Sequence, residues 1–132
     1  MTPIASFSLV AIDCPNALES ARFYSAITGW EIEVPGWLDG TLDDARWLQL
    51  RSDGGATIAF QQIADYVAPT WPGGVHPQQL HLDFDVPDLD VGEAAVLELG
   101  ARVVAIQPDP AEFRVFLDPV GHPFCLVRAT EP

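Results

Sequence analysis

Hydrophobic and polar positions follow the same order of patterns twice along the chain. In the first half, the mostly apolar residues 7–13 predict a strand, and apolar residues then recur at helical spacing between Asn16 and Gly29. In the second half, residues 81–86 alternate polar and apolar, and helical spacing follows between Asp88 and Gly100. Asn16 and Asp88 are good helix N-caps, and a glycine is a common helix stop.

Both halves then continue with three strand-like segments. A strand is expected over residues 30–34 and a hairpin over 46–51 and 57–63, and their counterparts are 101–106, 114–117 and 123–127. The two capping residues lie 72 positions apart, an offset that aligns Leu9 with His81. The pattern therefore predicts an α+β fold of two tandem βαβββ modules. We expect one domain over residues 1–132, with module one at about 5–63, a Pro/Gly-rich connector at 64–79 and module two at about 80–128.

Composition narrows the classes of function. The chain has 132 residues, 48% of them hydrophobic, and a formal charge of −13, which opposes binding to nucleic acid or anionic membrane surfaces. No apolar run approaches the roughly 20 residues of a membrane helix, and the N-terminus lacks the pattern of a secretory signal, so a cytoplasmic protein is expected. Cys14 and Cys125 form no CxxC pair, and both are expected to be buried as small hydrophobic residues.

Polar side chains gather on one predicted sheet face. The period of two along a strand places His81 and Asp83 opposite the helix-facing apolar positions, and it places Gln61 and Cys125 on the same open face. Apolar walls with a few polar groups are typical of a ligand pocket. The alternative is that His81 and Asp83 are satisfied by backbone groups or by Arg114.

The doubled pattern resembles the vicinal oxygen chelate superfamily, and more narrowly its small glyoxalase-like, bleomycin resistance-like branch. The resemblance covers about residues 5–128. It rests on Arg22-Phe23-Tyr24, Gly29-Trp30, Ala59-Phe60-Gln61, Pro69-Thr70-Trp71-Pro72, the run from His76 to Asp83, and Asp118-Pro119-x-Gly121. It implies the fold of the glyoxalase, bleomycin resistance and dihydroxybiphenyl dioxygenase proteins, in which the two modules form a curved sheet around a cavity. It also implies a tendency to form homodimers.

The resemblance also suggests where a divalent metal would bind. The four ligand positions of the superfamily's metal enzymes fall on Leu9, Gln61, His81 and Cys125. Leu9 has no donor atom, Gln61 is a weak donor, and Cys125 stands where these enzymes usually carry Glu. We therefore expect no native metal. If one binds, His81, Gln61 and Cys125 are the candidate ligands, and a His/Cys pair favours a softer ion such as zinc, with Gln61 or Asp83 completing the shell.

Two functions follow from this sequence. The first is a module that binds a small organic molecule without chemistry, using His81, Asp83, Gln61, Cys125 and Arg114, with Trp37 and Trp71 at the cavity mouth. The second is an enzyme of the lyase, isomerase or dioxygenase type. It would use His81 with a non-standard metal site or as a general acid–base, with Asp83 orienting it or Cys125 as a nucleophile. His76 and His122, each before a proline, are interpreted as turn residues.

Overall fold

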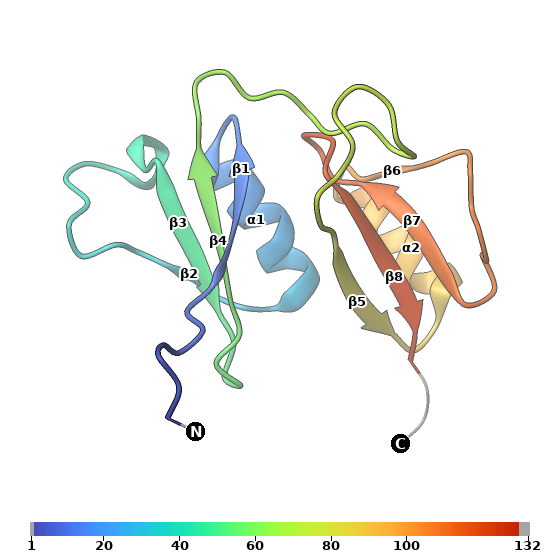
Figure 1. Ribbon diagram of the computed structural model, residues 1–132, viewed down its shortest axis with the longest axis horizontal. Helices are drawn as coiled ribbons and strands as arrows, with labels where there is room; N and C mark the ends of the chain where they lie inside the picture. The colour runs from blue at the N-terminus through green and yellow to red at the C-terminus, as the bar shows by residue number, and fades with distance from the viewer. Residues whose placement is uncertain (1, 130–132) are drawn as a thin grey trace. The chain divides into compact units, whose positions relative to one another are not determined.

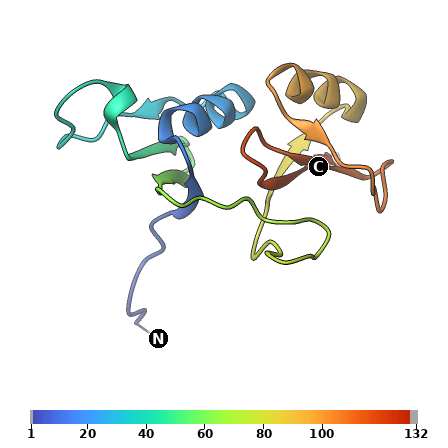
Figure 2. The same ribbon diagram turned by 90° about the horizontal axis from the view of Figure 1, so that it is seen from above.

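The structure is a computed structural model that describes residues 2–129, and it divides into two compact units at the Tyr66–Val67 bond. Each unit contains one four-stranded mixed sheet with one α-helix against one of its faces (Figures 1 and 2). The α+β fold of two tandem βαβββ modules is therefore confirmed. Within residues 2–129, no helix is long and apolar enough to cross a membrane.

The first unit holds module one. Its elements are β1 (Val10–Cys14), α1 (Ala17–Thr28), β2 (Ile32–Glu33), the 3₁₀ turn η1 (Leu42–Asp44), β3 (Trp47–Arg51) and β4 (Thr57–Gln62). The strand order is β1-β4-β3-β2, in which β1 runs parallel to β4 and the other neighbours are antiparallel.

The second unit repeats this topology. Its elements are β5 (Leu82–Val86), α2 (Leu89–Glu98), β6 (Arg102–Val103), β7 (Phe113–Leu117) and β8 (Pro123–Arg128). The strand order is β5-β8-β7-β6, again with one parallel pair, β5 and β8, at the same place. Because directly paired residues point to the same side of a sheet, this register assigns every strand side chain to one of two faces.

Local capping explains where the helices begin and end. The Asn16 side chain accepts a hydrogen bond from the backbone N–H of Glu19, and the Asp88 side chain accepts one from the N–H of Val91. Gly29 ends α1 with a left-handed φ of 75°, which glycine adopts without strain, and its N–H bonds to the Ser25 carbonyl at 2.8 Å.

In each module, the helix-facing side of the sheet forms the core. Phe60 of β4 is fully buried and stacks on Tyr24 of α1, with ring centroids 5.5 Å apart. In module two, the buried rings of Phe116 and Phe124 stack at 5.6 Å on the side of the sheet that faces α2. The other face of each sheet, called the open face below, has no helix of its own module against it, and it carries the polar side chains of interest.

Several strands are shorter than the sequence pattern predicts. β1 starts at Val10 rather than Phe7, since its ladder with β4 begins at the Val10–Ile58 pair, and Phe7 is 85% exposed. The strands predicted over 30–34 and 101–106 shrink to two residues each, β2 and β6. Both are edge strands that hydrogen-bond to a single neighbour, so only part of each apolar run pairs.

The repeat is not uniform along its length. β5 starts 72 positions after β1, from residue 10 to 82, but β8 starts only 66 positions after β4, from residue 57 to 123. The second helix is shorter, and so is the loop before the third strand. As a result, the module-one counterpart of Cys125 is Ala59, while Gln61 corresponds to Val127.

Candidate functional site

The open face of module two brings three sequence-predicted residues together. Nε2 of His81 lies 3.1 Å from a carboxylate oxygen of Asp83. Asp83 on β5 is paired directly with Cys125 on β8, so both side chains leave the sheet on the same side. One ligand atom from each of these three residues lies within 4.8 Å of the other two. The Cys125 residue is 7% exposed, whereas the His81 and Asp83 side chains are 40% and 57% exposed.

The Cys125 thiol is held in its protonated form. The pKa of Cys125 is raised to about 11, mainly because burial removes solvation from the thiolate. The negative charge of Asp83 and a hydrogen bond between the two side chains contribute the rest of this rise. A thiol with a raised pKa is a poor nucleophile at neutral pH, so the arrangement does not support covalent chemistry at Cys125.

Arg114 does not belong to this cluster, although the sequence analysis counted it as a ligand-binding residue. Its register partner on β8 is Leu126, so Arg114 extends from the face that packs on α2. There its guanidinium bonds to Asp90 at 2.8 Å and to Glu93 at 2.7 Å. These contacts raise the pKa of Arg114, first through the hydrogen bond to Asp90. The residue ties β7 to α2, on the opposite side of the sheet from Asp83.

Gln61 and Leu9 lie in the first unit. Gln61 is exposed on the open face of module one, where it pairs with Asp13 and Trp47. Its neighbour Gln62 has a structural role, since its side-chain oxygen accepts a hydrogen bond from the N–H of Ala17 at the start of α1. Leu9 is a half-buried residue just before β1.

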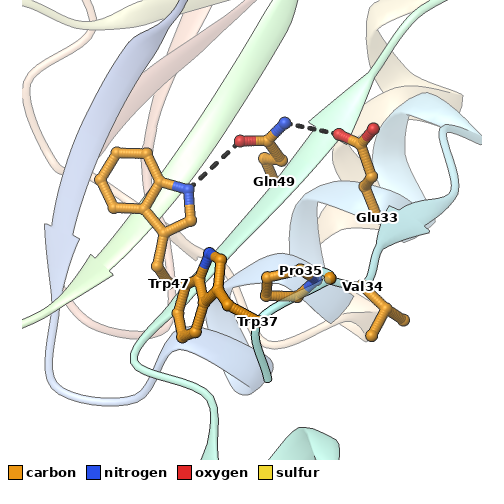
Figure 3. A pocket seen from close by; sticks show the side chains of 7 residues that line it. Glu33, Val34, Pro35, Trp37, Trp47 and Gln49 are labelled. Atoms are coloured by element: carbon orange, nitrogen blue, oxygen red, sulfur yellow. Dashed lines mark hydrogen bonds between the residues drawn. The ribbon is translucent and has the colours of Figure 1, made fainter. Parts of the chain in front are cut away.

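A pocket of about 230 Å³ opens in module one, and all seven residues that line it belong to the first unit. Trp47 and Gln49, two positions apart on β3, line it from the open face, and Trp37, a residue that is 68% exposed, contributes its indole. The other lining residues are Glu33, Val34, Pro35 and Gly36. Figure 3 shows the side chains of Trp47, Gln49 and Glu33 in a row.

Hydrogen bonds fix the polar side of this pocket. The indole N–H of Trp47 donates to the amide oxygen of Gln49 at 3.2 Å, and the amide nitrogen of Gln49 donates to a carboxylate oxygen of Glu33 (Figure 3). Arg51 lies 3.5 Å from the same carboxylate oxygen. The pKa of Glu33 is lowered mainly by the hydrogen bond from Gln49. Desolvation raises this pKa by a smaller amount than the hydrogen bond lowers it, and Arg51 lowers it as well. Glu33 therefore presents a negative charge to the pocket at neutral pH.

Sequence reasoning identified Trp37 but missed Gln49 and Glu33. The signal was present, since the alternation in residues 47–51 puts Trp47, Gln49 and Arg51 on one face. The remaining candidate from sequence, Trp71, is half-buried in the connector and belongs to the second unit.

His76 and His122 both lie in turns or loops, as interpreted from the sequence. The carbonyl of His76 accepts the N–H of Thr70 at 2.7 Å, which closes the loop around Gly73 and Gly74. The N–H of His122 donates to the buried carboxylate of Asp118 at 2.9 Å, in the turn between β7 and β8.

Comparison with protein families gives a match to the glyoxalase-like domain over residues 9–127. The chain belongs to the glyoxalase-like family. This confirms the resemblance to the vicinal oxygen chelate superfamily drawn from the repeat and its motifs. A comparison with curated proteins gives no match.

Solved structures of the same fold support this assignment. A glyoxalase/bleomycin resistance protein/dioxygenase family enzyme from Burkholderia phytofirmans PsJN is 16% identical, with a TM-score of 0.66 over 96% of this chain and 100% of that one. The fosfomycin resistance protein FosX from Mesorhizobium loti is 16% identical, with a TM-score of 0.66 over 97% and 94%. A glyoxylase/bleomycin resistance protein/dioxygenase domain from Frankia sp. EAN1pec is 23% identical, with a TM-score of 0.61 over 97% and 100%. At these identities the likeness establishes the fold.

The divalent metal that the superfamily resemblance implies does not fit the four positions of this chain that correspond to the ligands of the superfamily's metal enzymes. A hard divalent ion is bound by several oxygen or imidazole ligands. Leu9 offers no donor, and the register makes Ala59, not Gln61, the counterpart of Cys125. His81 is the one strong ligand among the four positions. These four positions therefore do not form a site for a hard divalent ion.

Proposed function

We propose that this glyoxalase-like protein binds a small planar organic molecule that carries a cationic or hydrogen-bond-donating group. The observation that carries the proposal is the module-one pocket, where two indoles stand beside the carboxylate of Glu33. Aromatic faces attract both planar rings and cations, and a carboxylate with a lowered pKa keeps its charge at neutral pH. With a volume of about 230 Å³, below the roughly 300 Å³ typical of sites for drug-sized ligands, the pocket favours a single-ring molecule.

The preformed geometry supports binding. Gln49 accepts from Trp47 and donates to Glu33, so its amide holds both neighbours in place before a ligand arrives. A ligand then loses less affinity to the ordering of side chains. The formal charge of −13 also favours the approach of cations over anions.

Benzamidinium is a suitable first probe, with benzamide and benzoate as neutral and anionic analogues of similar shape. We expect benzamidinium to change the tryptophan fluorescence of the protein saturably, and benzoate to have no effect. Glu33→Gln should weaken benzamidinium binding about tenfold, and Trp37→Leu should weaken it at least as much. Glu31→Gln is the matched control, because Glu31 is an exposed carboxylate two positions away that does not line the pocket. Equal binding of all three probes, or an equal loss in Glu31→Gln, contradicts the proposal.

A second candidate function is acid–base chemistry at His81. It is favoured by the 3.1 Å contact with Asp83, which would orient the imidazole. It ranks second because the pocket described above is lined by residues of module one and not by this pair. A substrate turned over by the wild type and not by His81→Gln would reverse that order.

A further inference from the structure

We propose that the ligand of the module-one pocket is a zwitterion, a single-ring aromatic α-amino acid, whose carboxylate binds Arg51 while its ammonium group binds Glu33. This rests on the proposed function, in which the same pocket binds a ring and a cation. Arg51 does not line the pocket, but it follows Trp47 and Gln49 at every second position of β3, on the open face. Its Nη2 lies 3.5 Å from Oε2 of Glu33. A positive and a negative group therefore stand side by side at the polar side of the pocket.

The ion pair between Arg51 and Glu33 can be exchanged for contacts with a ligand. The two side chains are 55% and 45% exposed, and an ion pair this exposed contributes little to stability. Gln49 and Arg51 contact the same oxygen of Glu33, Oε2, so Oε1 takes part in neither contact. When the guanidinium turns toward a ligand, the amide of Gln49 still holds the carboxylate in place. Each of the two charged groups can therefore take a partner from the ligand at small cost.

The paired charges disfavour ligands with a single charge. A cation bound to Glu33 would bring its charge close to the guanidinium of Arg51, which repels it. An anion bound to Arg51 would stand beside the carboxylate of Glu33 and would also meet the formal charge of −13. A zwitterion offers an opposite charge to both residues and has no net charge. In an α-amino acid both charged groups are attached to one carbon, so its charges lie as close together as those of the pair.

The rest of the pocket fits the aromatic part of such a ligand. Trp37 and Trp47 line the same pocket as Glu33 (Figure 3). The amide of Gln49 alone separates the indole N–H of Trp47 from the carboxylate of Glu33, since it hydrogen-bonds to both. An aromatic amino acid has a similarly short link, one methylene between the ring and the carbon that carries the charges. The volume of about 230 Å³ favours one ring over two.

Phenylalanine, phenethylammonium and 3-phenylpropanoate are the probes, because they share a ring and a carbon chain and differ only in their charged groups. Tryptophan fluorescence, excited where phenylalanine does not absorb, measures their binding to the full-length protein. We expect the wild type to bind phenylalanine about fivefold more tightly than phenethylammonium, and to bind 3-phenylpropanoate most weakly. Arg51→Gln should weaken phenylalanine binding about fivefold and leave phenethylammonium binding unchanged or tighter. Arg51→Lys keeps the positive charge and should keep the preference for phenylalanine.

Arg22→Gln is the matched control. It makes the same change of charge at an exposed position of α1, the helix on the other face of the sheet, and should change none of the three affinities. Circular dichroism checks that each variant is folded. The proposal is wrong if the wild type binds phenethylammonium at least as tightly as phenylalanine, or if Arg51→Gln weakens both alike. If either result occurs while benzamidinium still binds through Glu33, the proposed function stands. If neither cation binds the wild type, the proposed function fails as well.

Discussion

Asp83 and Cys125 stand directly opposite each other in the parallel ladder of β5 and β8, with a carboxylate beside a buried thiol. This contact disfavours the thiolate, since a second negative charge would form next to the first. Thiol reactivity is therefore a direct test of the geometry.

The first prediction concerns the alkylation of Cys125. In a Cys14→Ala background with a chelator present, iodoacetamide should react slowly at pH 8, because the pKa of Cys125 is about 11. Asp83→Asn should speed the reaction by lowering this pKa, which should stay above the ordinary 9.0 since burial is the larger cause. The measurement is the alkylation rate against pH, with the urea-unfolded protein as the reference. If the folded protein is alkylated as fast as the urea-unfolded protein, the pKa of Cys125 is not raised.

The second prediction separates Arg114 from ligand binding. Arg114→Met keeps most of the side-chain volume but removes the bonds to Asp90 and Glu93 on α2. We expect a lower urea midpoint and unchanged binding of benzamidinium. Arg102→Met, at an exposed position on β6, is the control and should leave the midpoint nearly unchanged. A loss of benzamidinium binding in folded Arg114→Met would show that Arg114 does contribute to the ligand site.

Local signals in the sequence were sufficient for the architecture. A capping side chain, helical spacing and a terminal glycine act over a few residues, and so the two helices, and through them the repeat, could be predicted from Asn16 and Asp88. The alternation at residues 81–86 likewise placed Asp83 on the face away from α2, as the register shows, and His81 lies 3.1 Å from Asp83.

The sequence alone could not show which residues of the two modules correspond to each other after their long loops. The spacing between modules changes from 72 positions at the first strand to 66 at the last, so a constant offset cannot identify the counterpart of Cys125. The face of Arg114 was missed for a related reason, since it depends on the register between β7 and β8 and on acidic residues in α2 that pair with it. The homodimer and the cytoplasmic location stay predictions.

The third prediction is a pH limit for the module-one pocket. The pKa of Glu33 is lowered below its ordinary 4.5, mainly by the hydrogen bond from Gln49, so the charged form persists on acidification and is lost only as pH falls through that lowered value. Affinity for benzamidinium should be nearly constant from pH 7 to about 5 and fall below pH 4.5. Gln49→Leu should move this fall to higher pH, as fluorescence titrations at each pH can show. If the affinity of Glu33→Gln for benzamidinium falls at the same pH, then a group other than Glu33 causes the fall.

The fourth prediction concerns the two helix caps. The side-chain oxygens of Asn16 and Asp88 each accept a backbone N–H at 2.9 Å, three residues further on. Removing either cap leaves a helix N–H without this partner, so Asn16→Ala and Asp88→Ala should each lower the free energy of unfolding by about 1 kcal/mol. For a chain of this size that corresponds to a fall of about 3–5 °C in Tm.

Exchange variants distinguish the cap from the charge. Asp88→Asn and Asn16→Asp keep the accepting oxygen, and we expect each to lose less than half of what its alanine variant loses. Urea unfolding followed by circular dichroism and by tryptophan fluorescence measures both quantities. All four tryptophans precede residue 72, whereas both helices contribute to the dichroism. If Asp88→Asn unfolds as early as Asp88→Ala, then the charge at the start of α2, and not the capping hydrogen bond, stabilises that helix.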